Sequence, residues 1–197
     1  MAAVVLPTLP RLIETTVREI SRDRALEPSF GGDETLVRRI GTRHEIEVRV
    51  PAVASAGCGP ALVAALTLGK FDGAVMPIPE PKLPAVAYGT PLVNGGGQIG
   101  SSLVVDGLTP GVVIAAGKWL SITISGRRYA YFTTAQVTAS GGGAATLQIY
   151  PMIRRSPADN AVVELAEPKI EGRVILSDRD VRRIGALGFT FTIRERG

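Results

Sequence analysis

The chain has 197 residues, 45% of them hydrophobic, which suffices for one large domain or two small ones. Its 23 Gly and 14 Pro make up about 19% of the residues, against about 12% in average proteins, and favour many short strands over long helices. One Cys and one His exclude an internal disulfide and a Cys/His zinc site, and leave little material for histidine-based acid–base catalysis.

The net charge is only +4, but 18 of the 22 basic residues are Arg, whose planar guanidinium suits protein interfaces better than the Lys ammonium. Apolar runs stay below 18 residues, so we expect no membrane insertion. The apolar N-terminus lacks a basic segment and is broken by Pro7 and Pro10, unlike a signal peptide. We therefore expect a soluble protein made in the cytoplasm.

The first elements are two strands separated by a long connection. Residues 11–20 are predicted to form a strand, and residues 42–50 form a clearer one. In the second strand, His44, Ile46, Val48 and Val50 share one face and charged residues share the other, which is the alternation of a half-buried strand. The connection, residues 21–40, is charged and irregular. A connection of this length in a compact domain usually has a function.

Residues 60–68 are the best helix candidate, because Pro60 fits the first helical position and Gly69 fits the stop. Four prolines between residues 76 and 84 then prevent a continuing helix or central strand. Residues 82–165 carry nine charges, whereas the flanks, 1–81 and 166–197, carry 31. We therefore predict that residues 82–165 form a module inserted into a discontinuous outer domain.

The inserted module is predicted to consist of strands and tight turns. Its turn signals are Gly-rich or Asp-Gly pairs, and its strands are short and apolar. The predicted strands are residues 119–124, 128–137, 145–150 and 161–165. Five or more strands at this spacing indicate a small barrel or sandwich. After the module, Phe189, Phe191 and Ile193 alternate with polar residues in a final strand that packs on the helix or the sheet. The predicted fold is mainly β with one short helix.

The residues with reactive side chains do not form a recognisable catalytic or metal-binding pattern. His44 and Cys58 would make a nucleophilic dyad only if they met, and no nucleophile signature surrounds Cys58. Residues 94–100 are Gly-rich but lack the Lys-Ser/Thr of a phosphate loop, so we expect a hairpin turn. The acidic pairs at 33–34 and 178–180 are expected to be solvated turns. We predict no enzyme activity, no metal and no cofactor.

Two sets of Arg residues carry alternative interpretations. Residues 127–132, with Arg127, Arg128 and Tyr129, favour a packed barrel strand that begins at an Arg–Arg turn. The alternative is a surface that stacks and neutralises single-stranded nucleic acid. The Arg pairs at 38–39, 154–155 and 182–183 are either surface charge or salt bridges between subunits.

The inserted module resembles part of a known family. The resemblance rests on the order and spacing of segments over about 85 residues, with a looser match in the flanks. The segments are Gly89–Gln98, Ala116–Ile122, Gly126–Tyr129, Gly143–Arg154, Pro157–Leu165 and Pro168–Gly172. Together they are similar to the distal tail protein family of long non-contractile-tailed (siphovirus-like) bacteriophages and prophages.

This resemblance implies a belt domain related to the tail-tube fold, built from the two flanks, with an inserted oligonucleotide/oligosaccharide-binding-type (OB-like) β-barrel. It implies a virion protein at the distal end of the tail, a homo-hexameric ring joining the tail tube protein to the baseplate hub and other tail-tip proteins. DNA would only pass through the lumen. Because the chain ends after the closing strand, no additional carbohydrate-binding domain is expected, and the role would be architectural.

In such a ring, we expect the 21–40 segment to reach the neighbouring subunit. The candidate contact residues share an apolar or basic character and are Phe30, Leu36, Val37, Arg38, Arg39 and Ile40. Two other functions remain open: another tail-tube or baseplate component, or a small barrel that binds single-stranded nucleic acid or a glycan. In the last case, mutating Arg127 and Arg128 would abolish a salt-sensitive oligonucleotide affinity.

Overall fold

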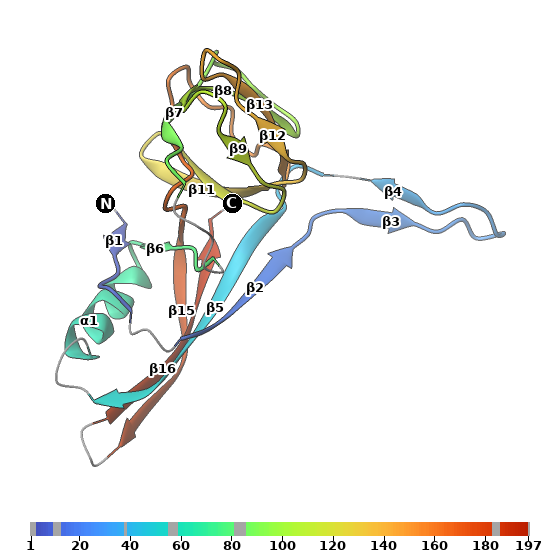
Figure 1. Cartoon of the computed structure of the whole chain (residues 1–197). Coiled ribbons are helices and arrows are strands. Elements are labelled where there is room, and N and C mark those ends of the chain that lie inside the picture. Colours follow the sequence, from blue (N-terminus) through green and yellow to red (C-terminus); the bar gives the residue numbers. More distant parts are fainter. Residues whose placement is uncertain are drawn as a thin grey trace.

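The computed structural model describes residues 3–9, 13–37, 39–54, 59–80, 86–182 and 186–196. Within these residues the chain is mainly β, with one helix, as the sequence predicted. Figure 1 shows a long twisted sheet below, a barrel-like sheet above it, and a thin hairpin that extends away from both.

The long sheet is assembled from both ends of the chain. Its six strands, in sheet order, are β1 (Val4–Val5), β6 (Ala74–Pro77), β15 (Lys169–Arg182), β16 (Ala186–Glu195), β5 (Arg43–Ala54) and β2 (Glu14–Ile20). Neighbouring strands are antiparallel except for the short parallel pair β1–β6. The predicted strand at 42–50 is therefore confirmed in β5, and the final strand is confirmed in β16.

The helix α1 (Gly59–Gly69) matches the predicted helix at 60–68 to within one residue at each end. Its Leu62 and Leu66 are buried in one apolar cluster with Phe189 and Phe191 of β16. The predicted packing of these aromatic residues, on the helix or the sheet, is confirmed to the extent that they share one core with the helix. The alternation in β5 also holds, because His44, Ile46, Val48 and Val50 are all buried.

The upper sheet is nearly closed. In sheet order its strands are β14 (Val163–Glu164), β10 (Trp119–Ile124), β11 (Arg127–Thr133), β13 (Ala145–Tyr150), β8 (Ser102–Leu108) and β7 (Gly89–Val93). A bridge between Leu92 and Val162 brings β7 back to the segment that leads into β14. A separate apolar cluster fills the interior, including fully buried Leu103, Leu120 and Tyr131. The pair β9 (Val113–Ile114) and β12 (Val137–Thr138) lies beside this sheet.

Several predicted boundaries in the upper sheet are confirmed and others are wrong, since β14 covers only Val163–Glu164 of the strand predicted at 161–165. Strands β10 and β13 have the predicted bounds, and residues 94–100 connect antiparallel β7 and β8 as a turn. The strand predicted at 128–137 ends instead at Thr133, and the next residues turn before β12 begins. There the hydroxyl of Thr133 donates to the carbonyl of Ala115, 2.7 Å away, inside the molecule.

Two further predictions about local structure are wrong. The acidic residues 178–180 are not in a turn, because β15 continues through Arg182 and stays paired with β16. The irregular connection at 21–40 contains a hairpin, formed by β3 (Arg24–Leu26) and β4 (Thr35–Val37). In both segments, backbone pairing across a hairpin gives strand structure that an alternation of side chains does not reveal.

Gly172 allows β15 and β16 to approach closely. A Cβ atom at this position would lie 2.1 Å from the carbonyl oxygen of Arg194, far inside van der Waals contact. Gly172 pairs with Glu195 in the register of the two strands. The absence of a side chain at Gly172 therefore allows the end of β16, which carries Glu195, to pair closely with β15.

Candidate functional site

The most prominent feature of the molecule is the hairpin that projects from the end of the long sheet (Figure 1). We call residues 21–40 the arm. Its strands pair in the register Ala25 with Leu36, and its outer end contains Gly31 at a φ of 78°, in the left-handed region that favours glycine. At its inner end, the backbone N–H of Arg39 donates to Asp23 Oδ1 at 2.7 Å, and that of Arg22 donates to Thr42 Oγ1 at 3.3 Å.

The arm exposes large apolar side chains to solvent. Phe30 at its end is fully exposed, with a relative accessibility of 102%. Leu26, Leu36 and Ile40 are more than half exposed as well. Such side chains gain free energy only when another surface covers them, at roughly 25 cal/mol per Å² of apolar area. The arm is therefore suited to contact a partner rather than to stabilise its own subunit.

The residues predicted to make contacts between subunits lie together on this arm. Phe30, Leu36 and Ile40 are exposed, Val37 is half-buried, and Arg39 is exposed. Arg38 lies outside the described residues. The sequence located the segment and its apolar residues, but not the hairpin that presents them.

A basic pocket lies where the arm meets the sheet. This hollow has a volume of about 540 Å³ and is lined by four arginines together with Asp23, Ser21, Ile40 and Gly41. The arginines, which we call the basic pocket residues, are Arg22, Arg24, Arg39 and Arg43. None of the four forms an ion pair with a residue that the structure describes. The Nε–H of Arg43 is buried and has no hydrogen-bond partner among those residues.

The arm is carried by a body in which a buried carboxylate joins the two sheets. Glu195, at the end of β16, has a side chain that is 1% exposed. Its Oε1 accepts a hydrogen bond from the backbone N–H of Ala130 in the barrel (2.8 Å) and from Nη2 of Arg154 (2.7 Å). Its Oε2 accepts one from the backbone N–H of His44 in β5, also at 2.8 Å. One carboxylate thus connects β16, β5 and β11.

Arg154 is the counter-charge of this buried carboxylate. Burial alone would lower the pKa of Arg154, but the attraction and hydrogen bond of Glu195 outweigh it, so the pKa is raised and the guanidinium stays charged. The guanidinium carbon also lies 5.2 Å and 5.8 Å from the ring centres of Tyr129 and Tyr131. The suggestion that Arg154 is surface charge or an inter-subunit bridge is therefore wrong: its pairing is internal.

Aromatic rings surround His44 at the same junction. Its ring lies 4.8 Å from that of Trp119 in an edge-to-face arrangement, and 5.9 Å from that of Phe132. Burial, and secondarily the charge of Arg154, lower the pKa of His44 to about 4. The imidazole is therefore neutral at pH 7 and acts as a packing group. Cys58, the other half of the dyad considered from the sequence, lies outside the described residues.

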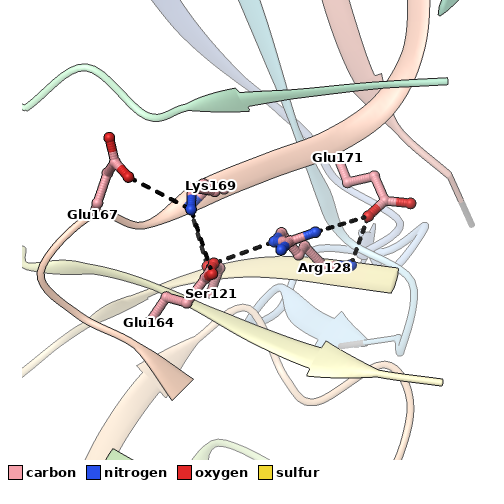
Figure 2. A network of polar contacts seen from close by, with 6 residues as sticks. All are labelled: Ser121, Arg128, Glu164, Glu167, Lys169 and Glu171. Carbon is pink, nitrogen blue, oxygen red and sulfur yellow. Dashed lines mark hydrogen bonds and ion pairs between the residues drawn. The ribbon is translucent and has the colours of Figure 1, made fainter. Parts of the chain in front are cut away.

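A second polar network connects the start of β15 to the barrel (Figure 2). Glu164 Oε2 accepts hydrogen bonds from the Ser121 hydroxyl at 2.7 Å and from Arg128 Nε at 3.3 Å. The backbone N–H of Arg128 donates to Glu171 at 3.0 Å. Lys169 Nζ lies 3.5 Å from carboxylate oxygens of both Glu164 and Glu167. Because these contacts bridge β10, β11, β14 and β15, the barrel is held to the sheet at two separate places.

These positions correct part of the predicted barrel surface. Tyr129 is 6% exposed and packs inside the barrel, so it presents no ring on which a nucleic-acid base would stack. Arg128 is half-buried in the network with Glu164 and Glu171. Only Arg127 of the three is exposed. The structure therefore brings none of these side chains into an open aromatic groove.

Sequence reasoning missed the Glu195–Arg154 pair, although a signal for half of it was present. Phe189, Phe191 and Ile193 alternate inward, and the same period places Glu195 on the buried face. A carboxylate in that phase predicts a buried partner, since an isolated buried charge is too costly. Arg154 follows a Pro-containing turn, where no periodicity indicates the direction of the side chain.

Within the described parts of the chain, no three His, Cys, Asp or Glu residues come together as a metal site would require. The same residues include no helix of a length and hydrophobicity that would cross a membrane. No protein-family model matches the chain, and no curated protein matches it significantly.

Proposed function

We propose that this protein is a non-enzymatic structural component of a phage tail tip. In this proposal it forms a hexameric ring that connects the tail tube to the baseplate hub and leaves a channel for DNA. The resemblance of residues 89–172 to distal tail proteins motivates the proposal. The long sheet would be the ring-forming belt domain, and the barrel-like sheet would be the inserted OB-like domain.

The observation that carries the proposal is the arm with its fully exposed Phe30. An arm that contacts the body of one neighbour, while its own body receives the arm of another, makes head-to-tail contacts. Head-to-tail contacts close into a ring when the rotation between subunits divides a full turn. The edge strand β2, paired only with β5 among the described strands, offers a second surface at the same side of the molecule.

The rigid attachment of the barrel agrees with an architectural role. The buried Glu195–Arg154 pair and the network around Glu164 hold the barrel at a fixed orientation to the sheet. A ring subunit benefits from such rigidity, because every barrel then has the same orientation around the ring. In this assembly the barrels project as a fixed platform for hub or fibre proteins.

Deletion of the arm tests the proposal. Replacing residues 24–38 with a short Gly-Ser turn is expected to abolish ring formation and leave a folded monomer, because the deletion removes the exposed apolar contacts but no buried core. Size-exclusion chromatography with light scattering and negative-stain imaging would measure this. Intact rings from the deletion variant would contradict the assignment of the arm.

A point substitution provides a sharper version of the same test. Phe30→Ser is expected to weaken the assembly at least about 10-fold, because an aromatic anchor in an interface contributes of the order of 2 kcal/mol. Ile99→Ser is the matched control, since Ile99 is 76% exposed on the barrel and lies far from the arm in the chain. Equal effects of the two substitutions would show that the loss is not specific to the arm.

A further inference from the structure

The charges of the arm are separated along its length. The outer part carries three carboxylates, Glu27, Asp33 and Glu34, which we call the acidic tip. All three are exposed, and none forms an ion pair with a described residue. The inner end carries the four basic pocket residues, which also lack ion pairs in the described structure. The arm is therefore polarised, with unpaired negative charge outside and unpaired positive charge inside.

The acidic tip cannot neutralise the basic pocket of its own chain. Glu27 follows Arg22 by five positions, about 16 Å of extended strand, and Arg24 by three, about 10 Å. Thr35 pairs with Leu26 in the last pair of the hairpin register, so Glu34 and Glu27 both lie beyond it, toward the outer end. This separation exceeds the Debye length of about 8 Å at physiological salt, so attraction within one arm is largely screened. Both groups of charges are therefore available to a second molecule.

We propose that the acidic tip of one subunit binds in the basic pocket of the next. This inference rests on the proposed head-to-tail assembly and names the site that receives the arm. The pocket offers several guanidinium groups that can bind the carboxylates of the acidic tip. Arg forks match carboxylates with two parallel hydrogen bonds, and the hollow of about 540 Å³ has room for carboxylate side chains. In the contact, Phe30 at the tip reaches the exposed Ile40 at the rim of the pocket.

The charge pattern favours this partner over a nucleic acid. A polyanion attracted to Arg22 and Arg24 would meet the carboxylate of Asp23 in the pocket and the acidic tip on the same arm. A second arm also meets Asp23, but it presents its negative charge only at its end and therefore avoids the acidic tip that a longer polyanion would meet. The same polarity gives the assembly a direction. A tip-to-tip or pocket-to-pocket contact would bring like charges together and is therefore disfavoured.

A charge-swap experiment tests the inference. The tip variant carries E27R and E34R, and the pocket variant carries R22E and R24E, all at exposed positions. Each variant alone is expected to assemble at least about 10-fold more weakly than the unmodified protein, because every tip then meets a pocket of its own sign. An equal mixture is expected to assemble again, in alternating order, because each tip then finds an opposite pocket. The variant with all four substitutions should also assemble.

The measurement is sedimentation velocity of the full chain at two salt concentrations, with thermal unfolding to confirm that each variant is folded. R155E with K70E is the control for the change in net charge of the pocket variant, since both residues are exposed and lie outside the arm. Binding of a labelled oligonucleotide is measured on the same samples.

The outcomes separate this inference from the proposed function. The tip–pocket contact is overturned if assembly tolerates both swaps. It is also overturned if neither mixing nor the fourfold variant restores assembly. Neither result contradicts the proposed ring. Loss of oligonucleotide binding in the pocket variant without loss of assembly also overturns it. Restored assembly into open chains rather than rings supports the contact and contradicts the ring. A protein that stays monomeric contradicts both.

Discussion

Replacing Glu195 with alanine is expected to lower the free energy of unfolding by about 3–5 kcal/mol, which is the usual cost of breaking a buried ion pair. The substitution leaves the guanidinium of Arg154 buried without its counter-charge. It also leaves the backbone N–H groups of His44 and Ala130 without their acceptors. These groups belong to both sheets, so the loss falls on the junction between them.

Urea unfolding, followed by the fluorescence of the chain's single Trp, would measure this effect. Trp119 is a good reporter because its ring packs against His44 and Phe132 at the junction. Glu167→Ala is the matched control: Glu167 is 67% exposed, and its ion pair with Lys169 is expected to contribute less than about 1 kcal/mol. An equal, small effect of both substitutions would show that the junction does not depend on Glu195.

Acidification is expected to destabilise the protein through His44. The pKa of His44 is about 4 in the folded protein, compared with about 6.5 in an unfolded chain. Between these values the unfolded chain binds more protons, so the free energy of unfolding falls as the pH is lowered from about 6.5 to about 4. A difference of this size corresponds to roughly 3 kcal/mol, lost across that window. The stabilisation is fully present at pH 7.

The comparison of His44→Phe with the unmodified protein isolates this contribution from the titrating carboxylates. The variant keeps an aromatic ring against Trp119 and Phe132 but has no group that binds a proton. The difference between the two proteins in unfolding free energy should shift in favour of the variant as the pH falls below about 6.5. A difference that stays constant between pH 7 and pH 4.5 would contradict the burial of a neutral imidazole.

The strands that cover a core were predictable from the sequence. Phe189, Phe191 and Ile193 alternate because one face of β16 is buried, and the bounds of β10 followed from its apolar run and the turn after it. Hairpins without a buried face were not predictable in this way. The arm places few side chains in any core, so its strands lack alternation, although Gly31 and Gly32, between Phe30 and Asp33, are a recognisable turn signal.

The candidate site was predictable only in part. Exposure of Phe30 depends on the arm leaving the body, and a lone Phe among charges does not indicate that. The basic pocket requires Arg22 and Arg43, on opposite sides of the hairpin base, to face one hollow, which only the register of the strands determines. Tyr129 was considered with Arg127 and Arg128 as a candidate surface contact, but its phase in β11 points it into the barrel.

Imaging of the purified full-length protein tests the central claim most directly. The proposal predicts closed rings with six-fold symmetry and a central hole wide enough for double-stranded DNA, in which the arm of each subunit lies on its neighbour. Class averages from negative stain or cryo-electron microscopy would show this, with light scattering giving the number of subunits. A monodisperse monomer, or an assembly in which the arms make no contact between subunits, would contradict the account.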